Sequence, residues 1–148
     1  MATSLLLKGL RFVGSLYLLG CLSILLHELA HLLAALVMGM QIKKIAIGPE
    51  TTWGFRIGIV FLSPLLIPAH VEAEAVRETF SSLKMAFFVF SGPFISLSMA
   101  LLFFLLHNSP GGYINLALLI SSLLPFPRGK TDMGSFLSAI DQMSKNRP

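Results

Sequence analysis

Two long stretches of the chain are almost free of charged residues. Between Phe12 and Ile42 only Glu28 is charged, and residues 85–106 carry no charge at all. A helix over either stretch would span the roughly 30 Å of a bilayer's hydrocarbon core at a rise of about 1.5 Å per residue. A third apolar stretch, residues 113–126, is shorter and runs into prolines, so its helix should stop inside the membrane. We therefore predict membrane helices over about residues 12–42, 85–106 and 113–126.

The hydrophobic period changes between the first two of these stretches. Apolar residues there occupy every second position, which is a strand pattern: Trp53, Phe55, Ile57, Ile59 and Phe61. An earlier strand containing Ile45 and Ile47 is predicted to end at Gly48-Pro49. We therefore predict a small hairpin or sheet over about residues 42–62. The most charged stretch, from Glu72 to Lys84, is predicted to form a solvated or interfacial helix.

The composition agrees with a chain that resides in a bilayer. Hydrophobic residues make up 55% of the 148 positions and charged residues 12%, with a mean hydropathy of +0.80. This balance is more apolar than that of a soluble domain, and three spans leave no room for a separate soluble module. We predict a single domain over residues 1–148, an all-α membrane protein with a three-transmembrane-helix core. A small membrane-associated β-hairpin or sheet lies between its first two helices.

The basic residues are unevenly divided by the three predicted spans. Lys8 and Arg11 fall on one side of the membrane, whereas the other nine of the 11 basic residues fall on the opposite side. By the positive-inside rule, the strand region and the C-terminus are cytoplasmic. The basic residues match no nucleic-acid-binding motif, so we expect a lipid bilayer and no nucleic acid as partner. The predicted location is the cytoplasmic membrane of the cell.

The first apolar stretch contains an H-E-x-x-H motif, His27-Glu28-Leu29-Ala30-His31. On a helix, positions i and i+4 lie on one face, so His27 and His31 can bind one metal ion. Glu28 would lie beside that ion and can accept a proton from a water molecule. The alternative is that these side chains are polar residues satisfied by neighbouring helices. Three ionisable residues within five positions of an apolar span are costly in lipid, which favours the metal site.

A catalytic zinc ion takes three protein ligands and keeps one position open, so one ligand lies outside the motif. Asp132 follows the short third span and can therefore lie at the membrane depth of His27. The alternative is that Asp132 caps a helix, because apolar residues follow it at helical spacing. We favour the ligand, with His70 and Glu50 as the remaining alternatives. The predicted cofactor is Zn²⁺.

Three segments in this order resemble the site-2 protease family of intramembrane zinc metalloproteases. They are the H-E-x-x-H helix followed by Ile47-Gly48-Pro49, then Ser91-Gly92-Pro93-Phe94, then Leu123-Leu124-Pro125-Phe126-Pro127 leading to Asp132. The chain is similar to a minimal member without a PDZ domain. The resemblance implies a three-helix catalytic core, Asp132 as the third zinc ligand, and an active site inside the membrane that opens toward the cytoplasm.

The sequence departs from the family pattern at two positions. Met133 stands where the family has a glycine after the ligand aspartate. Ser122 stands where the family has an asparagine that helps to hold the substrate carbonyl, and Asn115 is a possible substitute on the same helical face. In the strand region, Gly54 and Gly58 would let an extended substrate approach a sheet edge, although they could equally serve sheet packing.

These observations predict a zinc metalloendopeptidase that hydrolyses a peptide bond in or next to a transmembrane segment. Its substrate is a membrane-embedded protein or peptide, and an accessory membrane partner or an oligomer is left open. The alternative is a non-proteolytic membrane subunit that has the same fold and binds a metal or a partner. Glu28 favours the enzyme, because a site that only binds metal needs no base beside its ligands.

Overall fold

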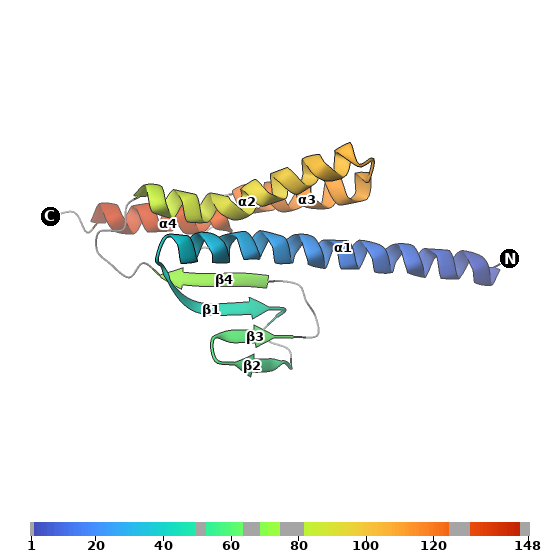
Figure 1. Ribbon diagram of the computed structural model, residues 1–148, viewed down its shortest axis with the longest axis horizontal. Helices are drawn as coiled ribbons and strands as arrows, with labels where there is room; N and C mark the ends of the chain where they lie inside the picture. Colours follow the sequence, from blue (N-terminus) through green and yellow to red (C-terminus); the bar gives the residue numbers. More distant parts are fainter. Residues whose placement is uncertain (1, 50–52, 64–68, 75–81, 125–130, 146–148) are drawn as a thin grey trace.

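The computed structural model describes residues 2–49, 53–63, 69–74, 82–124 and 131–145. The described part of the chain is mostly helical and contains one small sheet (Figure 1). In chain order its elements are α1 (Ala2–Val37), β1 (Gln41–Ile47), β2 (Phe55–Ile57), β3 (Val60–Leu62), β4 (Ala69–Glu74), α2 (Ser82–Leu105), α3 (Ser109–Leu123) and α4 (Asp132–Lys145).

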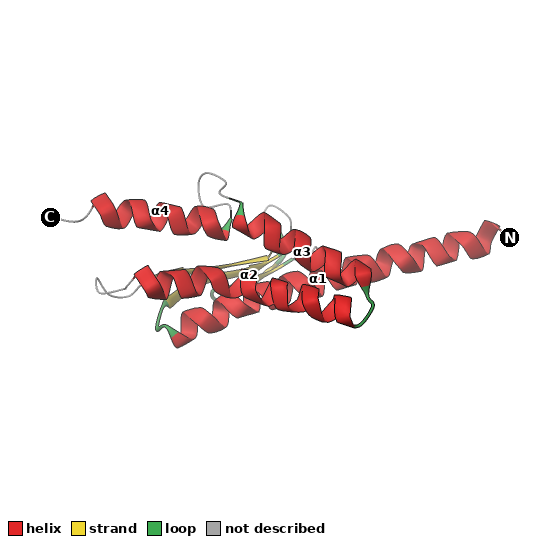
Figure 2. Ribbon diagram, turned by 90° about the horizontal axis from the view of Figure 1, so that it is seen from above, coloured by secondary structure: helices red, strands yellow, loops and turns green. Residues whose placement is uncertain are grey.

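Helix α1 is the central element of the fold. The sheet lies on one side of α1, where β1 and β4 contact it, and the other three helices lie on the opposite side (Figures 1 and 2). Helices α2 and α3 pack on α1 and on each other, while α4 packs on α2 and α3. A side chain on α1 can therefore face either the helices or the sheet.

Two helices of the described chain, α1 and α2, are long and apolar enough to cross a membrane. Much of their apolar surface is exposed, including Leu22 at 50% and Phe94 at 67%, which suits contact with lipid. Helix α3 has 15 residues and would rise only about 22 Å, less than the hydrocarbon thickness. The three-helix transmembrane core therefore stays a prediction.

Helix α1 ends earlier than the predicted span. It stops at Val37, where the Met40 N–H donates to the Ala35 carbonyl in a pattern that closes helix C-termini, and β1 begins at Gln41. The prediction of helix through residue 42 was wrong because residues 41–47 pair with other strands. Local hydrophobicity alone could not show that pairing.

The sheet has the strand order β2-β3-β1-β4, with β1 parallel to β3 and antiparallel to β4. A small sheet was predicted, and it is confirmed. The alternating run from Trp53 to Phe61 is not one strand, however. Gly58, at a φ of 59°, lies in the turn between β2 and β3, and that backbone conformation suits glycine in a tight hairpin.

The predicted charged helix over residues 72–84 was wrong in its first part. Glu72 and Glu74 belong to strand β4, which pairs with β1 in a register that places Val71 opposite Ile45. Residues 75–81 lie outside the described part of the chain, and helix α2 begins at Ser82. A period-two signal was present in the sequence, because alanine and valine alternate with polar residues over Ala69–Glu74.

Candidate metal centre

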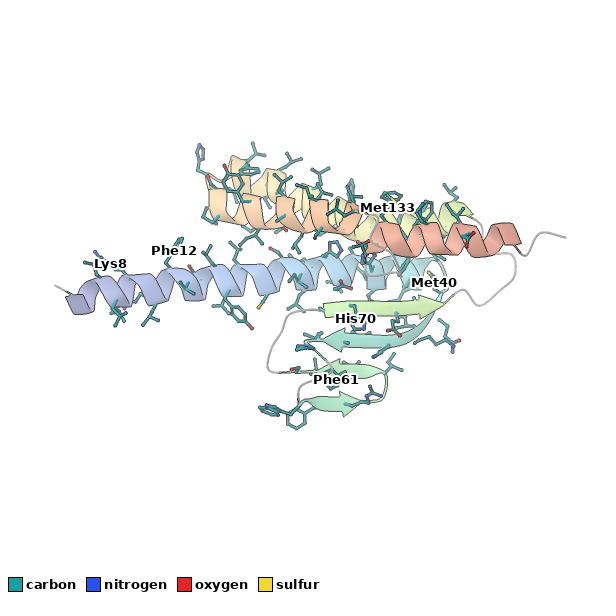
Figure 3. The ribbon with its side chains drawn as sticks, turned by 180° about the vertical axis from the view of Figure 1, so that it is seen from behind. Lys8, Phe12, Met40, Phe61, His70 and Met133 are labelled. Atoms are coloured by element: carbon teal, nitrogen blue, oxygen red, sulfur yellow. The ribbon has the colours of Figure 1, made fainter. Side chains whose placement is uncertain are left out.

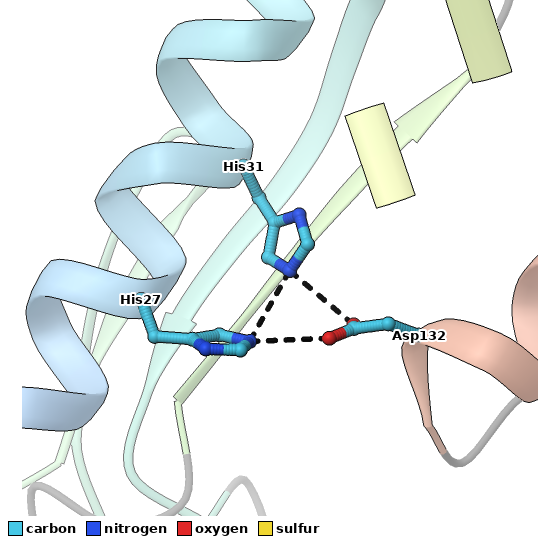
Figure 4. Close-up of side chains that lie close together, drawn as sticks. All are labelled: His27, His31 and Asp132. Atoms are coloured by element: carbon cyan, nitrogen blue, oxygen red, sulfur yellow. Dashed lines mark hydrogen bonds and ion pairs between the residues drawn. The ribbon is translucent and has the colours of Figure 1, made fainter. Parts of the chain in front are cut away.

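Helix α1 brings the two histidines of the motif together. His27 and His31 are 7% and 4% exposed, and their Nε2 atoms are 3.3 Å apart (Figure 4). Their spacing of four residues places both rings on the face of α1 that packs against α2, since each ring contacts an α2 residue. The motif thus points two ring nitrogens at one small volume.

Asp132 completes the cluster from the first turn of α4. Its Oδ2 lies 3.2 Å from His27 Nε2, and its Oδ1 lies 3.3 Å from His31 Nε2. The three residues can each offer a ligand atom, and these atoms all lie within 4.8 Å of one another. Burial tends to raise the pKa of Asp132, but the two histidines, which donate hydrogen bonds to it when their Nε2 atoms are protonated, outweigh burial and lower that pKa to about 2. The carboxylate is therefore anionic, as a metal ligand must be.

The capping role that competed for Asp132 is filled by its neighbour. Thr131 Oγ1 accepts a hydrogen bond of 3.1 Å from the Gly134 N–H, which is the geometry of a helix N-cap. The same hydroxyl donates to the Leu124 carbonyl at 2.6 Å and so ties the start of α4 to the end of α3. This arrangement leaves the Asp132 carboxylate to face the histidines.

The second nitrogen of each histidine is held by α2. His31 Nδ1 lies 2.9 Å from the Phe88 carbonyl and 3.2 Å from Ser91 Oγ, and His27 Nδ1 lies 2.8 Å from Ser96 Oγ. A carbonyl can only accept, so His31 carries a proton on Nδ1. In the neutral ring, Nε2 of His31 then presents a lone pair to His27 and Asp132.

This donor set fits a zinc ion. Two imidazole Nε2 atoms and a carboxylate converge, and when both rings are neutral with the proton on Nδ1 they bring lone pairs together with no hydrogen between them. A cation in their midst removes that conflict. Ligand atoms at about 2.0–2.1 Å from a tetrahedral zinc are separated by roughly 3.3 Å, close to the 3.2–3.3 Å found here.

Gly92 of α2 makes room for such an ion. A Cβ added at this position would overlap Nε2 of both His27 and His31. In the sequence, the segment Ser91-Gly92-Pro93-Phe94 was identified only by its resemblance to a family motif. The structure gives Gly92 a sharper role, because only a residue without a side chain fits against the two metal-facing nitrogens.

We expect Gly92→Ala to lose bound zinc while the protein still folds. Alanine is the better helix former by about 1 kcal/mol, so a loss of metal would come from the methyl group in the site. Gly20→Ala in α1 is the matched control, since a Cβ there meets nothing within 4 Å. Zinc content of the purified proteins is the measurement. Full zinc content in Gly92→Ala would show that the ion does not sit against α2.

Glu28 follows His27 directly on α1, so its side chain points about 100° around the helix from His27, toward the sheet. It is half-buried and lines a cavity of about 240 Å³ together with residues of β1 and β4. Val71 of β4 is among the residues that line this cavity. The side chain next to His27 therefore borders a space between α1 and the sheet that a water or a substrate segment could enter.

The residues predicted to hold the substrate carbonyl lie on α3, and both are buried. Asn115, at 1% exposure, donates one amide hydrogen to Ser23 Oγ and one to the Gly111 carbonyl, both at 2.9 Å. It therefore links α3 to α1 through these two bonds, and its oxyanion role stays a prediction. Ser122 donates to the Leu119 carbonyl at 2.9 Å, and its oxyanion role stays a prediction.

The two glycines predicted at a substrate edge have local roles in the hairpin. A Cβ at Gly54 would collide with the Leu62 carbonyl and the Phe61 ring, and Gly58 occupies the turn described above. Strand β2 is at the far edge of the sheet, whereas β4, at the other edge, contacts α1. A substrate role for Gly54 and Gly58 stays a prediction.

The alternative third ligands are not part of the cluster in the described chain. His70 lies on β4, with its Nε2 3.5 Å from Glu72 Oε1, on the side of α1 away from α4 (Figure 3). Glu50 lies outside the described residues. Asp132 is therefore the carboxylate that the described structure brings to the histidines.

Comparison with known proteins gave one match. The model of peptidase family M50 matches residues 15–146, nearly the whole chain. No curated protein and no solved structure matched the chain. The matched range includes the H-E-x-x-H motif, the Gly92 segment and Asp132.

Proposed function

Since the chain belongs to peptidase family M50, the site-2 protease family, we propose that it is an intramembrane zinc metalloendopeptidase. The family match confirms the resemblance drawn from the sequence, and it supports a metallopeptidase. Together with the two apolar helices it indicates an integral membrane protein with membrane-protein substrates. Zinc, the catalytic residues and the site of cleavage are the proposed parts.

The observation that carries the proposal is the convergence of His27, His31 and Asp132. His27 and Asp132 are 105 positions apart in the sequence, and the three residues meet beside the one glutamate of the H-E-x-x-H motif. We assign His27, His31 and Asp132 as the zinc ligands. A merely structural polar cluster would not need a glutamate next to the first histidine, facing a separate cavity.

Glu28 is assigned as the general base. When bound, zinc supplies Lewis-acid polarisation of the scissile carbonyl and of the attacking water. Glu28 takes a proton from that water and delivers it to the amine that leaves. The cavity between α1 and the sheet gives Glu28, next to His27, access to water.

The substrate must present an extended segment at this cavity. A transmembrane helix hides its peptide bonds within its own hydrogen bonds, so it has to unwind locally before hydrolysis. In the described sheet, β4 is the edge strand that contacts α1, and its residue Val71 lines the cavity of Glu28. An unwound segment lying along this edge would bring a peptide bond beside Glu28.

Comparing the membrane peptides of cells that carry wild-type or Glu28→Gln protein tests the proposed function. Cleavage products that appear only with the wild type would identify the substrate and the bond. Identical peptide sets, with both proteins present at equal levels in the membrane, would contradict an endopeptidase of membrane proteins.

We expect a reporter fused after Pro148 to lie in the cytoplasm. The reason is the distribution of the basic residues, which places Lys8 and Arg11 alone on the far side. A reporter inserted at the Asn108–Ser109 turn between α2 and α3 is the matched control and should lie outside the cytoplasm. The reverse pair of results would contradict the proposed orientation in the cytoplasmic membrane.

A further inference from the structure

One face of α2 lines the metal site without supplying any of the three proposed ligands. Phe88, Gly92 and Ser96 follow one another at intervals of four residues and so lie on one face of the helix. The Phe88 carbonyl bonds to His31, Gly92 leaves space beside both histidines, and Ser96 bonds to His27. This face of α2 therefore contacts the rings of both proposed histidine ligands.

Ser96 is almost completely buried. Its exposure is 1%, and its Oγ lies 2.8 Å from His27 Nδ1. A hydroxyl inside an apolar helix packing loses its water and must find a partner within the protein. The same helix shows the ordinary solution at Ser98, which is exposed and donates to the Phe94 carbonyl one turn earlier at 2.9 Å. Ser96 differs because its oxygen meets a ring that faces the metal site.

The two histidines are supported differently. His31 Nδ1 has a backbone carbonyl as partner, so its tautomer is fixed whatever stands at Ser91. The partner of His27 Nδ1 is the Ser96 hydroxyl, which can accept the Nδ1 proton and leave Nε2 free as a ligand. Without that oxygen, the Nδ1–H of His27 would be buried against an apolar side chain.

We propose that Ser96 is a positioning residue that holds His27 in the tautomer and ring orientation needed to bind zinc through Nε2. The inference rests on the proposed metal site, but it concerns a residue outside the ligand set. Partners of this kind commonly contribute about 10–100-fold to metal affinity, because they orient the ring and raise its basicity. Ser96 thereby sets the zinc affinity of the site from the second helix.

The test compares Ser96→Ala with a matched serine variant of α2, Ser98→Ala. Zinc affinity of each purified protein is measured by competition with a chromophoric chelator, and thermal unfolding of the zinc-free proteins checks the fold. We expect Ser96→Ala to bind zinc about 10–100-fold more weakly. Ser98→Ala should stay close to wild type, because the Ser98 hydroxyl is exposed and bonds to the Phe94 carbonyl.

A second readout separates positioning from a general loss of packing. In zinc-loaded protein with nitrogen-15-labelled histidine, the Nδ1 proton of His27 should lose its hydrogen-bonded shift in Ser96→Ala and keep it in Ser98→Ala. Equal zinc affinities and unchanged His27 spectra in the wild type and both variants would overturn the role of Ser96 and leave the metalloprotease proposal standing. Wild-type protein that binds no zinc would overturn both.

Discussion

Replacing Glu28 by glutamine is expected to abolish peptide hydrolysis while zinc stays bound. The amide has nearly the shape of the carboxylate but cannot take a proton from water at neutral pH. General-base catalysis typically contributes about 10²–10⁴-fold to a rate, so cleavage should fall by at least that range. The three proposed zinc ligands are untouched, and Glu28 borders the cavity on the sheet side of α1. Zinc content and cleavage are measured on the same purified protein.

The same substitution distinguishes the enzyme from the alternative of a non-proteolytic metal-binding subunit. A subunit that only binds metal or a partner would behave alike in every assay with either glutamate or glutamine at this position. If Glu28→Gln cleaved at the wild-type rate, Glu28 would not be the base. If it lost zinc together with activity, the loss of cleavage could no longer be assigned to proton transfer, and the general-base role would fail this test.

Replacing Asp132 by asparagine is expected to lower zinc affinity by more than about 100-fold and to remove cleavage. Even the removal of a residue that only supports a zinc ligand costs about 10–100-fold, and Asp132 is proposed as a ligand itself. Its carboxylate oxygens lie 3.2 and 3.3 Å from the two histidine nitrogens, so a neutral amide there removes the negative charge of the site. Zinc affinity by chelator competition is the measurement.

Thr131→Ala is the matched control for the helix cap. It removes the hydroxyl that accepts from Gly134 and donates to Leu124, which should lower stability by about 1 kcal/mol without removing a ligand. Asp141→Asn controls for the exchange of a carboxylate by an amide on an exposed part of α4. Zinc retention in Asp132→Asn, with zinc loss in Thr131→Ala instead, would reverse the two roles assigned to these neighbours.

The cluster of His27, His31 and Asp132, the proposed zinc ligands, was largely predictable because two of its members depend on local geometry. Four residues separate His27 from His31, and any helix places such a pair on one face. For Asp132 the sequence left two roles open, because an aspartate at the start of a helix can either bind a metal or cap the helix. In the structure the Thr131 hydroxyl caps the helix, which leaves the Asp132 carboxylate to face the histidines. The sequence does not show these bonds of Thr131.

The support given by α2 could not be derived from local sequence. Ser96 and Gly92 matter only because α2 packs on α1 in one particular register, which sets Ser96 opposite His27 across 69 residues of sequence. Small residues at intervals of four in a membrane helix indicate close packing, but they do not reveal the partner. Asn115 shows the same limit, because its bond to Ser23 spans 92 positions.

The strands were mispredicted where pairing over a distance decided the structure. Glu72 and Glu74 were predicted to belong to a solvated helix because they are charged. They lie instead in β4, which forms because its backbone pairs with β1. The parallel pairing of β1 with β3 likewise joins residues that no turn signal connects directly, such as Ile45 and Val60. The period-two pattern marks a strand, but its neighbours are set by the whole fold.

Whether this chain hydrolyses peptide bonds with zinc at His27, His31 and Asp132 can be tested most directly in water enriched in oxygen-18. Purified protein is reconstituted with membrane proteins extracted from cells that lack it, in its zinc-loaded, chelator-stripped and zinc-restored forms. We predict new peptide carboxyl termini that carry one heavy oxygen in the loaded and restored forms, and none of them in the stripped form or in Glu28→Gln. The same labelled termini in the stripped protein, or none with fully zinc-loaded protein, would contradict a zinc-dependent intramembrane protease.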